Sequence, residues 1–83
     1  MTINNDIRQM AGASAIQHHM HRIDGFNSGV LHDMKKEDKE CAITDTIADI
    51  LHYAESVGIK SHSDICRVAQ QHMMDELEQE GKE

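Results

Sequence analysis

Histidine and carboxylate residues that share a helix face are the residues of this sequence whose types and spacing could do chemistry. His18 and His21 are three residues apart, and Asp24 follows three residues later, so a helix would place all three on one face. Imidazole nitrogens and a carboxylate oxygen are zinc ligands, but a zinc site takes three or four ligands in a fixed geometry. The spacing fixes no further ligand pair, so the sequence favours adventitious binding of nickel or zinc over a resident metal.

A second set consists of Asp45, Asp49 and His52, whose spacing of four and three places them on one helix face. An acidic residue followed three positions later by histidine also occurs in di-metal carboxylate bundles, where the ligands point into the bundle core. Here the set lies opposite the apolar stripe of the same predicted helix. We therefore interpret it as a solvated polar face, with a docking surface as the functional alternative.

A third set is His72 with Glu76, four residues apart within the apolar face of the last predicted helix. A polar pair on a buried face needs hydrogen-bond partners. The sequence favours a satisfied core or interface histidine bonded to Glu76. The same spacing occurs in hemerythrin-like iron sites, which leaves a metal site as the alternative; its ligands would be Asp49, His52, His72 and Glu76.

Nothing in the sequence predicts a catalytic nucleophile or a cofactor. Cys41 and Cys66 form no zinc pattern and have no histidine positioned by spacing, and there is no glycine-rich phosphate loop. Residues 1–23 lack the continuous apolar stretch of a signal peptide, and no segment approaches the roughly 20 apolar residues of a membrane span. We expect free thiols in a reducing cytoplasm and no membrane partner.

Three helices are needed to position these residues. The clearest is predicted at about 37–57, where Gly58 marks its C-terminus. A third helix is predicted after residues 61–64, where Ser61 with Asp64 resembles a capping box and Ser63 is a rival cap. The charged segment 76–83 is expected to be a disordered tail. The apolar stripes are Ile43, Ile47, Ile50, Leu51, Ala54 and Val57 on the central helix, and Ile65, Val68, Ala69, Met73 and Leu77 on the last.

The first helix is less simple, because its apolar residues fall on two nearly opposite faces. The phase changes at residues 11–13, so either the helix kinks there or both faces are covered. Residues 25–29 are a loop by composition, and residues 30–34 are expected to form a short extra turn. One face carries Ile3, Ile7 and Met10; the other carries Ala13, Ile16, Met20 and Ile23.

Length and charge bound the function. A chain of 83 residues without Trp forms one domain and buries roughly 60% of the surface that its unfolded chain exposes. Small domains with thin cores often gain stability by self-association, so we expect a homodimer. The net charge of −7 repels nucleic-acid phosphates and anionic lipid, which argues against direct nucleic-acid binding and favours solubility or a basic protein partner.

The stretch from Ala42 to Glu76 resembles short acidic helical accessory proteins of bacteriophages and other mobile elements. The pattern is Ala42-x-x-Asp45-x-x-Ala48-Asp49-x-x-His52, then Gly58, then Ala69-x-x-His72-x-x-x-Glu76. The resemblance covers about the last 40 residues and implies an accessory protein without an assigned activity.

A weaker resemblance is to the all-α nucleoside triphosphate pyrophosphohydrolases of the MazG type, which hold magnesium between an ExxE and an ExxD motif. Glu37 and Glu40 match the first motif. Thr46 stands where the second motif needs Glu, and Asp49 follows Glu40 too closely for the helical hairpin of that family. The magnesium site that this resemblance implies would therefore be incomplete.

Taken together, the sequence predicts an all-α, three-helix domain over residues 1–83 that acts by protein–protein contact, on itself and on a host protein that it modulates or inhibits. The alternative is a metal-binding helical protein or a metal-dependent nucleotide hydrolase; mimicry of nucleic acid is a third hypothesis. The residues predicted to contact a partner are Asp45, Asp49, His52, His72, Met74 and Glu76.

Overall fold

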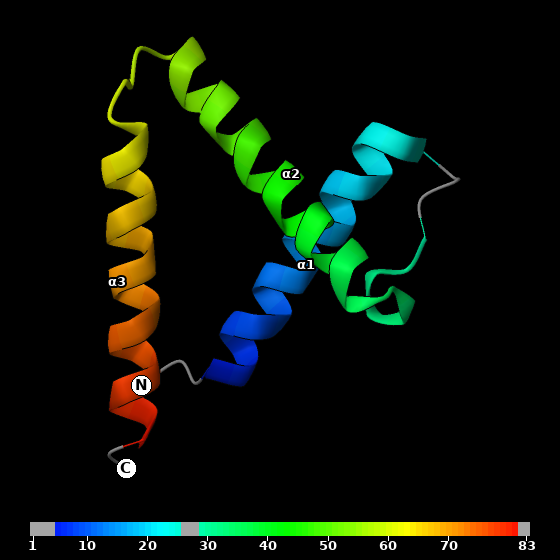
Figure 1. Cartoon of the computed structure of the whole chain (residues 1–83), viewed down its shortest axis with the longest axis horizontal. Coiled ribbons are helices and arrows are strands. Elements are labelled where there is room, and N and C mark those ends of the chain that lie inside the picture. The colour runs from blue at the N-terminus through cyan, green and yellow to red at the C-terminus, as the bar shows by residue number, and fades with distance from the viewer. Residues whose placement is uncertain (1–4, 26–28, 82–83) are drawn as a thin grey trace.

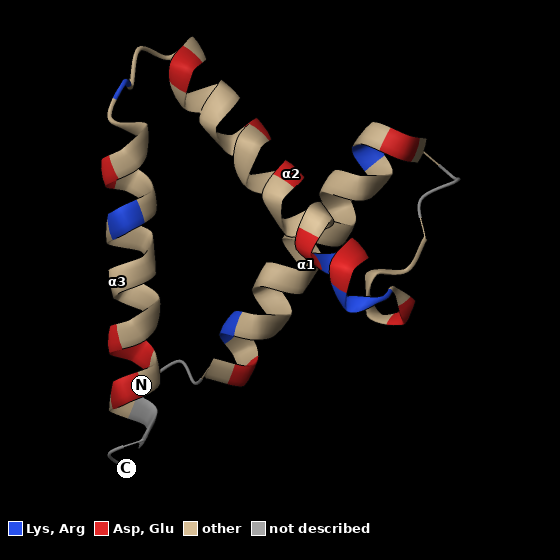
Figure 2. Ribbon diagram, in the orientation of Figure 1, with Lys and Arg blue, Asp and Glu red and all other residues tan. Residues whose placement is uncertain are grey.

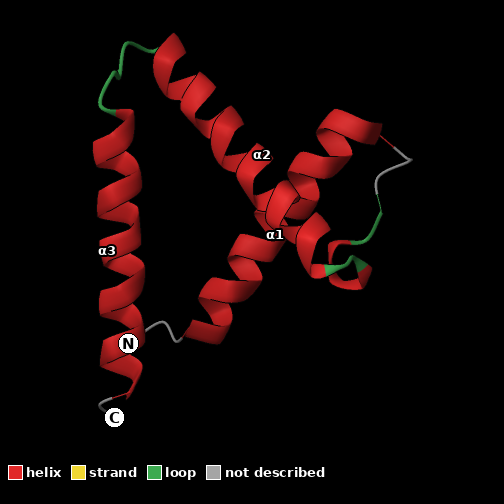
Figure 3. Ribbon diagram, viewed as in Figure 1, coloured by secondary structure: helices red, strands yellow, loops and turns green. Residues whose placement is uncertain are grey.

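The computed structural model describes residues 5–25 and 29–81 and is all-α, as predicted. It contains helix α1 (Asn5–Asp24), a short 3₁₀ turn η2 (Leu31–Asp33), helix α2 (Lys36–Ser56) and helix α3 (His62–Gly81). Within the described ranges there is no strand, and Figure 3 shows helices joined by short loops. The extra turn predicted at residues 30–34 is confirmed as η2. In the same ranges, no helix is both long and apolar enough to cross a bilayer.

The three helices form an open triangle (Figure 1). Helix α1 crosses α2, whereas α3 stands apart and approaches the other helices only near its two ends. The molecule measures 42 × 35 × 25 Å, and its radius of gyration is 14.6 Å. A compact domain of this length has a radius of gyration of about 12 Å. The chain is therefore more open than a closed three-helix bundle.

The crossing of α1 and α2 holds the best-packed residues. Met20 of α1 is buried, as are Ala42 and Thr46 of α2. The Thr46 hydroxyl donates a 2.7 Å hydrogen bond to the Ala42 carbonyl oxygen within α2, so its polar atom is satisfied without a partner from α1. Small and self-satisfied side chains let the two backbones approach closely, and this contact anchors α1 on α2.

The turn between α2 and α3 is set by Gly58. Its φ of 84° lies in the left-handed region that glycine adopts without steric cost. The Gly58 amide donates to the Glu55 carbonyl at 3.2 Å, and the Ile59 amide donates to the Ala54 carbonyl at 2.9 Å. These are the two bonds of a Schellman motif, so the predicted C-terminus of the central helix at Gly58 is confirmed.

Helix α1 is uninterrupted through Gly12, so it does not end at residues 11–13, and the kink expected there stays a prediction. Within this chain the face of Met10 is not covered, because Met10 is 68% exposed; cover by another copy of the protein stays a prediction. On the other face Met20 packs on α2, whereas Ile23 is 62% exposed. Ile3 lies outside the described residues.

Helix α3 differs from its prediction at both ends. It begins at His62, because the Ser61 carbonyl already accepts the first helical hydrogen bond, from the Ile65 amide at 3.0 Å. It continues to Gly81, so residues 76–81 of the expected disordered tail are helical, and residues 82–83 lie outside the described range. The start of that segment is held by contacts of Glu76 with α1.

The loop that leads into α2 is fastened to α1 by Gln17. Its amide nitrogen donates to the Gly29 carbonyl at 2.9 Å, and its amide oxygen accepts from the Leu31 amide at 2.7 Å. Both ends of one side chain thus hold the loop against the helix that precedes it.

Replacing Gln17 with alanine removes both bonds and leaves the part-buried Leu31 amide without its acceptor. We expect the free energy of unfolding to fall by about 1–2 kcal/mol, measured by urea denaturation. The matched control is Gln70→Ala at an exposed position of α3, for which we expect a change within about 0.5 kcal/mol. Equal losses in the two variants would contradict the role of Gln17.

Candidate interaction surfaces

The apolar stripes of α2 and α3 remain largely exposed. Ala54 is only 6% exposed, but Ile50 is 56% and Leu77 53% exposed. On α3, Ala69, Met73 and Leu77 line a hollow with Arg8 and Glu76. We call the exposed stripes the α2–α3 wedge; its residues are Ile43, Ile47, Ile50 and Leu51 of α2 and Ile65, Ala69, Met73 and Leu77 of α3.

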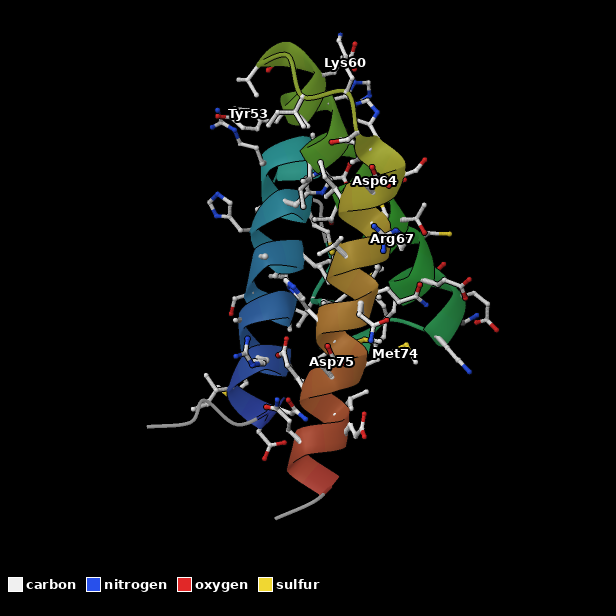
Figure 4. The ribbon with its side chains drawn as sticks, turned by 90° about the vertical axis from the view of Figure 1, so that its left-hand side faces the viewer. Tyr53, Lys60, Asp64, Arg67, Met74 and Asp75 are labelled. Atoms are coloured by element: carbon white, nitrogen blue, oxygen red, sulfur yellow. The ribbon has the colours of Figure 1, made fainter. Side chains whose placement is uncertain are left out.

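The opposite side of α3 is polar. Figure 4 views this outer side and shows Asp64, Arg67 and Asp75 along it. Asp75 accepts a 2.9 Å hydrogen bond from the Gln71 amide, which keeps this row of side chains bonded along the helix surface. The apolar stripe of α3 therefore points towards α1 and α2. Even so, its residue Met73 is 51% exposed.

The whole chain exposes more surface than a compact protein of its mass. The accessible surface is 7014 Å² for a mass of 9.4 kDa. A compact monomer of that mass exposes about 5000 Å². Among the described residues, no side chain is fully enclosed. The predicted thin core is confirmed, and it lies at the crossing of α1 with α2, whereas the two apolar stripes remain open.

A second surface is an acidic concavity of about 380 Å³ between α1 and α2. Asp24 of α1 lines it with Asp38, Asp45 and Asp49 of α2, and His19 stands beside them. The His19 Nε2 atom lies 2.6 Å from the Asp49 Oδ2 atom, so this pair ties the two helices at their crossing. Figure 2 shows acidic residues along α2 in this region, whereas the middle of α3 carries no charged residue.

The residues of the first predicted metal set lie at the end of α1. His18, His21 and Asp24 are exposed on α1. Among residues 5–25 and 29–81, no group of three or more His, Cys, Asp or Glu side chains is placed to hold a metal ion. Neither predicted ligand set is therefore assembled.

The second predicted set, Asp45, Asp49 and His52, is exposed, as expected of a solvated polar face. Asp49 also bonds His19 across the crossing. This bond forms because α1 packs on Ala42 and not on the apolar stripe. Ala42 lies between the apolar stripe and the acidic stripe of α2. The packing of α1 on Ala42 therefore brings Asp49, at the edge of the acidic stripe, into contact with α1.

The core position predicted for His72 is wrong, because its side chain is exposed, whereas the interface alternative stays a prediction. Glu76 takes its partners from α1 instead. Its carboxylate lies 2.5 Å from the Arg8 Nε atom, and its backbone carbonyl oxygen accepts a 3.3 Å hydrogen bond from the side-chain amide of Asn5. These contacts connect the beginning of α1 to the end of α3. Glu76 therefore closes one corner of the triangle.

Met74 is exposed on the polar side of α3, as Figure 4 shows. Both cysteines are free and exposed, Cys41 on α2 and Cys66 on α3. Both thiols were predicted to be free.

Three residues that hold the site were missed by the sequence analysis: Arg8, Gln17 and His19. Each forms a contact with a residue distant in the chain, and the spacing of residues along one helix carries no signal for such contacts. His19 was passed over in favour of His18 and His21 as a metal ligand. It follows His18 directly in the sequence and therefore lies on a different face of the helix.

The chain matches no protein-family model, no curated protein and no solved structure at a significant level. The resemblances to mobile-element accessory proteins and to MazG-type enzymes therefore stay predictions.

Proposed function

We propose that this protein is a small interaction protein that works by contact with other protein chains. One observation carries the proposal: large apolar side chains of α2 and α3 remain exposed, among them Ile50 at 56% and Leu77 at 53%. Contiguous exposed apolar surface on a small protein marks a site of association. Burying it would supply the stability that the small core does not.

The acidic concavity supports a basic partner for the assembled protein. Its carboxylates come from both α1 and α2, and the whole chain carries a net charge of −7. Electrostatic complementarity of this kind speeds association with a positively charged surface and excludes acidic partners. Together with the resemblance to mobile-element proteins, it supports a host protein as the target.

Site-specific photo-crosslinking in cells tests the proposal. A photoreactive amino acid at Ile47 lies in the wedge, whereas one at Gln71 lies on the polar side of α3. We expect protein adducts of defined mass from position 47 and only background from position 71. Adducts to this same chain and to other proteins both count as support, because each is protein contact through the wedge.

Absence of adducts from position 47, or equal yields from both positions, would contradict the proposal. The adduct mass, read by mass spectrometry, also separates self-contact from contact with another protein.

A further inference from the structure

Helix α3 is held to the rest of the chain near its two ends. Among its described side chains none is buried, and the two that are half-buried are His62 at its beginning and Glu76 near its end. Figure 1 shows the same arrangement, since the ribbon of α3 stands apart from α1 and α2 between these points. A segment with so few buried contacts belongs to the least stable part of a fold, and it moves more easily than the rest.

We propose that α3 is a hinged arm that opens and closes against α1, with residues 57–61 as the hinge and the Arg8–Glu76 ion pair as the latch. In hinge motions a few residues at the ends of elements absorb the change in backbone angles, while the helices on either side stay rigid. The two ends of α3 supply these two parts.

The hinge end has room to turn and a fixed pivot. A side-chain carbon added at Gly58 would meet no atom within 4 Å, so no other group packs against the turn at this position. The pivot is Glu55 of α2, whose carboxylate lies 3.1 Å from the His62 Nε2 atom and also bonds the Lys60 ammonium group. These contacts hold the first turn of α3 beside the end of α2, so the far end of α3 is the end that moves.

The latch joins that far end to the beginning of α1. The Glu76 carboxylate and the Arg8 guanidinium are in contact, but their side chains remain 29% and 49% exposed. An ion pair that is this accessible to water contributes little to stability, and salt weakens it further. The closed position is therefore favoured only slightly, as a reversible latch requires.

The apolar packing behind the latch is incomplete. Ala69, Met73 and Leu77 of α3 line a hollow of about 430 Å³ with residues of α1. Met73 and Leu77 are already 51% and 53% exposed in the closed arm, so opening exposes little further apolar surface. The open arm would free this part of α3 for a partner. That link to a partner rests on the proposed function, whereas the motion is a property of the chain alone.

Distances between two spin labels measure the motion. Cys41 of α2 carries one label, and Met74→Cys on the outer side of α3 carries the other, in a Cys66→Ser background (Figure 4). Position 74 lies about 18 Å along the helix from His62, so a swing at the hinge moves this label much further than a label near the hinge. Double electron–electron resonance on labelled chain diluted with unlabelled chain reports distances within one molecule.

Arg8→Gln removes the cation of the latch. Arg67→Gln is the matched control, because Arg67 lies 3.9 Å from Asp64 within α3. We expect Arg8→Gln to raise the population at longer distances about two- to fivefold, and Arg67→Gln to keep the wild-type distribution. High salt is expected to shift the wild type in the same direction and to change Arg8→Gln much less. Circular dichroism checks that the helices are retained; if Arg8→Gln loses them, Glu76→Gln breaks the latch from the other side.

Two outcomes would overturn the proposal. One is a distance distribution that Arg8→Gln and high salt both leave unchanged. The other is an equal shift in Arg8→Gln and Arg67→Gln, which would reflect the loss of a positive charge and not of the latch. Photo-crosslinking from position 47 reports separately on the proposed function, because Ile47 lies on α2, outside the hinge and the latch.

Discussion

Replacing Met20 with alanine is expected to lower the free energy of unfolding by about 3 kcal/mol. Met20 is the only large apolar side chain that is buried in the described part of the chain, at 8% exposure. It fills the crossing of α1 with α2, and no neighbouring core exists that could relax into the space it would leave. Urea denaturation followed by circular dichroism, at one fixed protein concentration, measures the loss.

Met10→Ala is the matched control, because it is the same change on the same helix at a side chain that is 68% exposed. We expect its effect to stay within about 0.5 kcal/mol. If the two alanine variants lose equal stability, the crossing is not the centre of the fold. A fixed concentration matters because a dimer gains stability with concentration.

Ala42→Leu tests the same crossing from the other helix, and we expect it to cost about 2 kcal/mol. Ala42 is 8% exposed and lies against α1. A larger side chain there must push the two helices apart or take a strained rotamer. The chain would lose the close approach that lets Met20 reach α2.

The control for this variant is Ala11→Leu, at an exposed position of helix α1. Leucine and alanine differ little in helix propensity, so the control isolates the effect of volume at the crossing. We expect it to change the free energy of unfolding by less than about 0.5 kcal/mol. A stable Ala42→Leu variant would show that the two helices are not in close contact there.

The number, order and approximate bounds of the helices could be predicted because the signals are local. The spacing of the apolar residues of α2 and the glycine at position 58 lie within a few residues of the structure that they determine. The end of α3 could not be predicted in the same way. Its continuation to Gly81 accompanies a contact with Arg8, which lies at the other end of the chain.

The faces that pack together could not be predicted from periodicity. A stripe of large apolar residues on α2 predicts the buried side, but α1 packs on Ala42 and Thr46 instead. Small residues have little weight in an apolar pattern, although they permit the closest helix contacts. The exposure of Ile47 in one chain has a physical reason if the stripe is covered by another chain, which a single sequence does not show.

In the candidate site, too, features set by local spacing could be predicted and contacts between distant residues could not. Asp49 could be identified as a residue of interest because of its spacing from Asp45 and His52, but its partner His19 lies thirty residues away. The pairing of His72 with Glu76 was inferred from their distance along one helix. The charge of Arg8 provides a stronger partner for Glu76, and only the fold brings these two together.

The position of Glu76 also bears on how this chain folds. Its bond from Asn5 spans 71 residues of sequence, whereas helical hydrogen bonds join residues four apart. Contacts between residues distant in the sequence cost the most loop-closure entropy, and for that reason we expect them to form late in folding. We therefore expect α1 and α2 to assemble first and the docking of α3 to be the last and most readily reversed step. A helix that detaches without unfolding the rest of its chain can dock on another chain instead. The last step of folding would then also be the step at which chains associate.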